Sequence, residues 1–214
     1  MTTDAPRYGT VDHKYGMKLA TTPADEDGPV WMVNLMKYRD KADYVDGRES
    51  DISGQEADDL YSPLDSLAAV GAEPVFMADV GQQLLGDTPI WDRVAVVKYP
   101  TRQSFIEMQS LPSFQESHKH KDAGMDFTIV MGTQPMPDPT GPPGSTPTDW
   151  AHVPHPPTDE DGPVVVVHVL RFEDIAAAHQ TPQDMEHYQN AAAVAARAHG
   201  VRINGWFAVE STIL

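Results

Sequence analysis

A repeated segment near both ends of the chain constrains the fold most. Residues 25–38 read DEDGPVWMVNLMKY, and residues 159–172 read DEDGPVVVVHVLRF. The first six positions are identical, and the later ones keep their chemical type. Because self-similarity of this kind indicates a duplicated folding unit, the sequence predicts two copies of one structural unit.

Each repeated segment is followed by a helix and then a strand. A helical pattern covers Glu56–Gly71 after the first segment and Asp184–Gly200 after the second. Both patterns close on a glycine, the residue that most easily adopts the left-handed conformation just past a helix. Strand patterns follow over residues 73–85 and 202–214.

The first copy continues where the second stops. A strand is predicted over 91–99, helices over 102–110 and from Pro112 to about Lys121, and a last strand over 125–134. The order βαββαβ predicts an α+β fold, a ferredoxin-like four-stranded antiparallel sheet with helices on one face. The second copy is partial, and its two strands are not neighbours in this topology. It therefore needs strands from elsewhere, or the chain is a fragment of a longer protein.

These patterns predict four segments. Residues 1–22 form an N-terminal arm, and residues 23–134 form the complete unit. Residues 135–157 form a linker, because nine of the 19 prolines fall there and proline prevents both helix and sheet. Residues 158–214 form the partial second unit.

Charge and composition exclude several functions. With a net charge of −17, the chain would repel phosphate backbones and anionic membranes, so neither nucleic acid nor membrane is an expected partner. Because cysteine is absent, disulfides and thiolate sites are excluded. No signal peptide and no run of about 20 apolar residues is present, and we expect a cytoplasmic protein.

The stretch from Val30 to about Gln134 resembles the small dimeric α/β-barrel proteins grouped as a domain of unknown function. The resemblance rests on MVNLMKY at 32–38, GxxxxWD at 86–92, YPTR at 99–102 and HKDAGM at 120–125. It implies that two sheets pack face to face into a barrel, here pseudo-dimeric or formed by a homo-oligomer. Superfamily members include cofactor-free monooxygenases, lactone isomerases, haem-binding enzymes and plain ligand binders, so the resemblance indicates fold better than function.

The first strand offers a candidate pocket wall. Strand alternation places Met32, Asn34, Met36 and Tyr38 on one face. An amide among methionines suggests a substrate pocket in which Asn34 orients the ligand. The alternative is an asparagine whose hydrogen bonds are satisfied by neighbouring groups.

Two further residues are candidate acid–base groups. His168 occupies the position of Asn34 in the second copy and could act as a general base, or it could be a satisfied core histidine. Asp92, beside Trp91, could be a carboxylate with a raised pKa in a substrate pocket. It could instead cap a turn or pair with Arg93 or Arg102.

Arg102 and Tyr61 complete the predicted substrate-binding set. Arg102 could hold a substrate carboxylate at the start of a helix that Thr101 caps, or it could serve a structural role. Tyr61 could offer its hydroxyl to a ligand or simply cover the sheet.

No metal or cofactor is predicted. His118 and Asp122 lie one helical turn apart while His120 points elsewhere, so only two ligands would converge. Glycine-rich phosphate loops, GxSxG and HExxH motifs are absent. The sequence therefore favours a cofactor-independent enzyme that acts on a small, partly apolar organic molecule by acid–base chemistry, as an isomerase, lyase or ring oxygenase. The alternatives are a non-catalytic ligand-binding module and a haem-binding barrel enzyme.

Overall fold

The computed structural model describes residues 6–136, 164–171, 183–198, 201 and 205–214. The chain divides into two units. Unit 1 consists of Met1–Pro135 and Phe207–Leu214, and unit 2 of Met136–Trp206.

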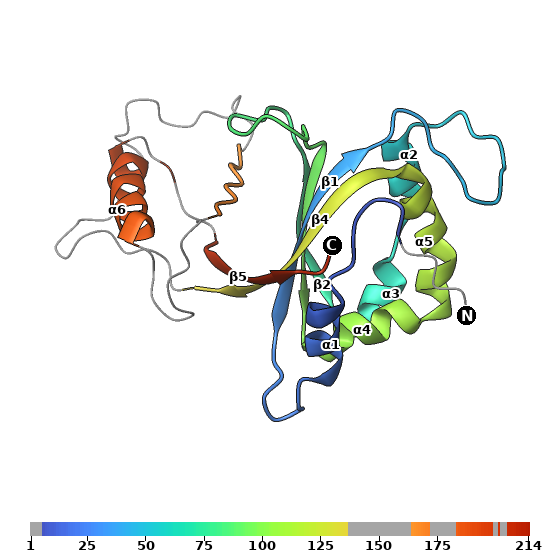
Figure 1. The fold of residues 1–214 in the computed structure, drawn as a ribbon, viewed down its shortest axis with the longest axis horizontal. Helices are drawn as coiled ribbons and strands as arrows, with labels where there is room; N and C mark the ends of the chain where they lie inside the picture. The colour runs from blue at the N-terminus through green and yellow to red at the C-terminus, as the bar shows by residue number, and fades with distance from the viewer. Residues whose placement is uncertain (1–5, 137–163, 172–182, 199–200, 202–204) are drawn as a thin grey trace. The chain divides into compact units, whose positions relative to one another are not determined.

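Unit 1 is a mixed α+β structure built on one open antiparallel sheet. The five strands follow the order β2-β3-β1-β4-β5, and the helices α1–α5 lie on one face of the sheet (Figure 1). From β1 to β4 the elements follow the βαββαβ order that the sequence predicts. The bounds are α1 (His13–Thr21), β1 (Val30–Tyr38), α2 (Gly54–Leu60), α3 (Leu64–Ala69), β2 (Glu73–Asp79), β3 (Arg93–Tyr99), α4 (Arg102–Ser110), α5 (Pro112–Gly124), β4 (Met125–Pro135) and β5 (Phe207–Thr212).

Capping residues and prolines set the helix ends. Thr101 accepts a hydrogen bond from Ser104 N, which confirms it as the N-cap of α4. The single helix predicted over 56–71 is instead two helices, α2 and α3, because Pro63 interrupts the hydrogen-bond ladder between them. Gly71 follows α3 with φ +69°, as its predicted role at the helix end requires.

The N-terminal arm contains a helix that the sequence analysis missed. Asp12 caps α1 by accepting hydrogen bonds from the backbone of Lys14 and Tyr15. Tyr15 and Leu19, one turn apart, are both buried against the sheet. The Tyr15 hydroxyl approaches Gly132 of β4 so closely that a β-carbon there would clash with it. Residues 13–21 of the predicted N-terminal arm are therefore helical.

The C-terminal strand differs most from the prediction. β5 pairs antiparallel with β4, with Met131 opposite Thr212, so it extends the first sheet. Residues 164–171, predicted as the matching first strand, have no strand assignment, and Val164 and Val166 are largely exposed. A strand requires a hydrogen-bonded neighbour, and the sheet of the described residues contains only β1–β5.

Unit 2 contains one described helix, α6 (Gln183–Ala198). It corresponds to the helix predicted over 184–200, although residues 199–200 lie outside the described part of the chain. Most of the predicted linker, residues 137–157, also lies outside it.

The helices α2 and α5 approach each other closely at two glycines, the first residue of α2 and the last residue of α5. A β-carbon on Gly54 would clash with Gly124 O, and a β-carbon on Gly124 would clash with Gly54 O. Gly54 N also donates to Arg39 O at the end of β1. Only glycine at both positions allows this approach, which fixes the two helices that cover the site described below.

The opposite face of the sheet carries a separate apolar cluster. It is centred on Val33, Leu35, Val94 and Met131, with Trp91 and other side chains packed against it. The sheet does not close on itself, so unit 1 alone is not a barrel. No helix within the described ranges is long and apolar enough to cross a membrane.

Candidate functional site

A cluster of polar and titratable side chains, four of them buried and three partly buried, lies between the sheet and the helices α2 and α5. We call it the buried polar cluster, and it consists of Tyr8, Tyr38, Asp58, Tyr61, Arg93, His118 and Lys121. Polar groups in such a position are costly unless they are paired, so each partner and each unpaired atom is informative.

Asp58 on α2 is the acidic centre of the cluster. It is 7% exposed, and its Oδ2 accepts a 2.6 Å hydrogen bond from the Tyr38 hydroxyl. Burial and the neighbouring Asp58 raise the pKa of Tyr38 far above its usual value, so this hydroxyl remains a donor. The second oxygen, Oδ1, is buried and has no hydrogen-bond partner within the described ranges.

Arg93 supplies the counter-charge. Its guanidinium lies 3.4 Å from Asp58 Oδ2 and forms 2.7 Å ion pairs with Asp59 and Asp79. It also lies over the Tyr38 ring, 5.5 Å from the centroid. Since Arg93 is itself 7% exposed, these contacts fix the carboxylate of Asp58 from one side.

His118 on α5 is the imidazole of the cluster. Its Nε2 lies 2.9 Å from the Tyr8 hydroxyl, while its Nδ1 is buried without a partner in the described part of the chain. Burial and the charge of Lys121 lower the pKa of His118 to about 4, against the opposing effect of Asp122. The ring is therefore neutral at physiological pH.

Aromatic rings connect the acidic and imidazole sides. Tyr61 lies edge-on to His118, with ring centroids 5.9 Å apart, and Phe114 stacks on His118 at 5.0 Å. Burial raises the pKa of Tyr61, and the nearby Tyr99, Tyr8 and Asp58 add to the effect. Tyr8 packs in one apolar group with Tyr38 and Met36, so the Asp58–Tyr38 and His118–Tyr8 pairs are neighbours.

Lys121 places a cation beside these rings. Its Nζ lies 5.3 Å from the centroid of the Tyr61 ring. Burial lowers the pKa of Lys121, and Asp58 counteracts this effect. The cluster thus combines a carboxylate oxygen, an imidazole nitrogen and an ammonium group around apolar rings.

Three predicted substrate-binding residues belong to this region. Tyr38 and Tyr61 are members of the buried polar cluster, and Met36 packs against Tyr38. Met32 instead lies deep in the main core at 1% exposure. Asn34 is partly exposed and donates to Met32 O at 3.2 Å, the neighbouring-group interaction of its alternative interpretation.

The structure places Asp92 and Trp91 in a different environment. Asp92 Oδ1 accepts from Lys37 Nζ at 3.1 Å, and its Oδ2 accepts from Tyr38 N at 2.7 Å. Trp91 stacks on Phe127, with centroids 5.8 Å apart, and packs with the cluster on the sheet face away from the helices. These contacts match the pairing alternative for Asp92, with Lys37 in place of the predicted arginines.

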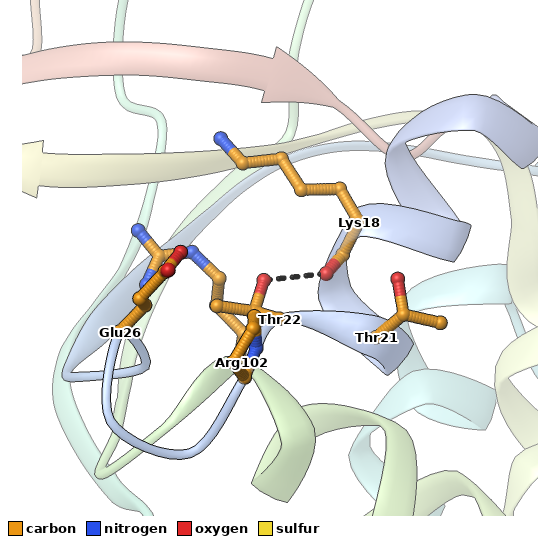
Figure 2. Close-up of a pocket in the computed structure, with 6 residues that line it drawn as sticks. Lys18, Thr21, Thr22, Glu26 and Arg102 are labelled. Carbon is orange, nitrogen blue, oxygen red and sulfur yellow. Dashed lines mark hydrogen bonds between the residues drawn. The ribbon is translucent and has the colours of Figure 1, made fainter.

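Arg102 is engaged by two carboxylates of unit 1. It pairs with Glu210 of β5 and, at 3.3 Å, with Asp27. It also lines a surface hollow of about 390 Å³ with Lys18, Thr21, Thr22 and Glu26. Figure 2 shows these side chains, and the dashed line marks the hydrogen bond from Thr22 Oγ1 to Lys18 O. The guanidinium connects β5 to the segment that precedes β1, which corresponds to the structural alternative for this residue.

His168 belongs to unit 2, whereas Asn34 and Asp92 belong to unit 1. It is exposed, and its Nδ1 lies 2.5 Å from the Tyr188 hydroxyl of α6. Within the described ranges His168 therefore bonds Tyr188 of its own unit, and its role as a base alongside Asn34 and Asp92 stays a prediction.

Sequence reasoning missed Asp58, Arg93 and Tyr8, and it considered His118 only as a metal ligand. The signal for Asp58 was present, because Gly54, Ala57, Asp58 and Tyr61 form one helical stripe that faces inward. His118, His120 and Asp122 have separate partners, namely Tyr8, Tyr44 and Arg7. Among the residues that the structure describes, no three such side chains form a metal site.

Comparison with known proteins gives a fold but no reaction. No family model and no curated protein matches the chain. The crystal structure of methylated RPA0582 protein is similar, with a TM-score of 0.52 and 26% identity over 64% of this chain and 96% of that one. A structure of RPA0582, a protein of unknown function from Rhodopseudomonas palustris, has a TM-score of 0.52 and 23% identity over 62% of this chain and 99% of that one. The likeness supports the α+β architecture of the chain.

Proposed function

We propose that the protein is an enzyme that transfers a proton on a small, partly apolar organic molecule, with Asp58 as the base and His118 as a neutral hydrogen-bond donor. One observation carries the proposal. Asp58 Oδ1 and His118 Nδ1 are both buried without a partner among the described residues, although the remaining donors and acceptors of both side chains are bonded. Buried polar atoms are normally satisfied, so this pair is suited to a ligand.

The two groups fit proton abstraction next to a carbonyl. Asp58 Oδ1 would remove the proton from carbon, and His118 Nδ1–H would donate a hydrogen bond to the carbonyl oxygen as negative charge develops there. A neutral imidazole suits this role, and the low pKa of His118 keeps it neutral. The aromatic rings around His118 would bind the apolar part of the molecule. This transfer uses side chains alone, in keeping with the cofactor-independent chemistry expected from the sequence.

The test measures deuterium uptake. Wild-type protein is incubated in D2O with a metabolite extract, and mass spectrometry identifies small molecules that gain deuterium only when the protein is present. Asp58→Asn and His118→Phe should each reduce this uptake by about 100-fold or more, the usual contribution of an acid–base group. His120→Gln is the matched control, because His120 lies on the same helix but bonds Tyr44.

Two outcomes would contradict the proposal. The first is the absence of any protein-dependent deuterium uptake, and the second is equal uptake by wild type and Asp58→Asn. Binding of a small molecule that the protein does not alter would favour the ligand-binding alternative instead.

We also propose that the apolar face of the sheet packs against the same face of a second copy, which would complete a barrel. The centre of this face is already apolar. Residues 164–171 form no strand, so a second chain is the better source of the second sheet. Phe127, which stacks on Trp91 of this face, is 38% exposed, and exposed apolar side chains that adjoin an apolar cluster commonly mark an interface.

Light scattering after gel filtration should find a dimer, and Phe127→Glu should convert it to a monomer. Phe127 is 38% exposed and stacks on Trp91 of this face, so a charge there would be buried in the interface. Leu60→Glu is the control, since Leu60 is exposed on α2 on the helix side. A monomeric wild type at high concentration would reject the barrel.

A further inference from the structure

The segment before α1 brings a tyrosine into the buried polar cluster. Tyr8 is 2% exposed, and its carbonyl oxygen accepts a hydrogen bond from Thr128 N of β4. Its hydroxyl lies 2.9 Å from His118 Nε2. A residue outside the βαββαβ unit thus contacts the imidazole that the proposed reaction uses.

Arg7 fixes this segment to the helix side of unit 1. Its Nε donates to Asp122 Oδ2 at 2.9 Å, and its Nη1 donates to Asp43 Oδ2 at 2.7 Å. Its Nη2 donates to the carbonyl oxygens of Asp43 and Asp122. An arginine bonded to two side chains and two carbonyls restricts the neighbouring Tyr8 to one position.

The hydrogen bond between Tyr8 and His118 can form in two ways. If His118 Nε2–H donates, the Tyr8 hydroxyl loses its acceptor and His118 Nδ1 remains an unpaired acceptor, which leaves two buried groups unsatisfied. If the Tyr8 hydroxyl donates, the proton of the neutral ring lies on Nδ1, and only that N–H is unsatisfied. Because each unsatisfied buried group costs about 1–3 kcal/mol, the second arrangement is favoured.

We propose that Tyr8 is a positioning residue that donates to His118 Nε2 and thereby fixes the Nδ1–H form of the ring. The Nδ1–H then points its only free donor at the ligand. The consequence for catalysis rests on the function proposed above, whereas the position of the proton does not. In this arrangement Arg7 acts on His118 indirectly, because it holds Tyr8 in place.

The experiment locates the ring protons by ¹⁵N–¹H NMR correlation of histidine side chains in the full chain. In wild type, His118 should carry its proton on Nδ1. Tyr8→Phe keeps the ring but removes the donor, so the proton should redistribute between Nδ1 and Nε2. Releasing the segment with Arg7→Gln should move the His118 signals in the same direction. Any deuterium uptake should fall by about tenfold or more in Tyr8→Phe, because the wrong form of the ring faces the ligand.

Tyr44→Phe is the matched control. Tyr44 bonds His120 Nδ1 at 2.7 Å on the same helix, so this variant should alter the signals of His120 and leave those of His118 unchanged. A wild-type His118 protonated on Nε2, or a His118 spectrum unchanged by Tyr8→Phe, would overturn the inference. If a variant does not fold, the wild-type spectrum alone shows whether the His118 proton lies on Nδ1. If His118 carries its proton on Nδ1 and responds to Tyr8→Phe as predicted, but no deuterium uptake is found, only the proposed function is rejected.

Discussion

Replacing Arg93 by methionine should lower the free energy of unfolding by about 4 kcal/mol, the range measured when one partner of a buried ion pair is removed. Arg93 and Asp58 are both 7% exposed. Methionine fills similar space but provides no charge, so Asp58 would remain buried with only the Tyr38 hydroxyl as a partner. The exposed Asp59 and Asp79 can be solvated once Arg93 is removed, so the cost arises mainly at Asp58.

Urea denaturation followed by tryptophan fluorescence measures this effect. Arg48→Met is the control, because the Arg48–Asp46 pair is exposed and such pairs contribute about 1 kcal/mol or less. Adding Asp58→Asn to Arg93→Met should restore part of the loss, since the unpaired charge is then gone. If Arg93→Met costs no more than Arg48→Met, Arg93 is not the counter-charge of Asp58.

The sequence predicted the strands and helices of residues 30–135 well because their signals are local. Thr101 and Gly71 mark helix ends through their own backbone preferences, and apolar alternation marks β1. The sequence predicted the C-terminal strand but not its neighbour, because pairing depends on contacts between distant residues. Its pattern predicted a strand at 202–214, and the pattern alone could not show that β4 would be its neighbour.

The site was predicted only in part. Tyr38 and Tyr61 were identified from strand and helix faces, but Asp58 was missed although it lies on the same inward-facing stripe of α2 as Ala57 and Tyr61. The close approach of α2 and α5 at Gly54 and Gly124 joins residues 70 positions apart, and a contact between such distant residues leaves no local pattern in the sequence. Tyr8 was missed because the segment preceding α1 has no periodic pattern of its own.

Acid should selectively weaken the attachment of β5, because Glu210 is its most strongly bonded side chain. Burial of the Glu210 carboxyl opposes its ionisation, but hydrogen bonds from Arg102, Gln134 and Lys18 outweigh this effect and lower the pKa of Glu210 to about 2. The ordinary value is 4.5. A group whose pKa is lowered by folding stabilises the fold above its unfolded pKa, and this contribution is lost as the pH falls from about 4.5 to about 2.

A shift of this size corresponds to about 3 kcal/mol, so Glu210→Gln should lower the free energy of unfolding by up to that amount at pH 7 and by almost nothing near pH 2. The measurement is urea denaturation of wild type and variant across this range, and their difference cancels the titration of the other carboxylates. Amide hydrogen exchange should show faster opening of β5 in the variant at pH 7. Glu116→Gln should follow the wild type, because Glu116 is an exposed residue paired within its own helix. A stability difference between wild type and Glu210→Gln that does not change with pH would show that the carboxylate does not hold β5 through its charge.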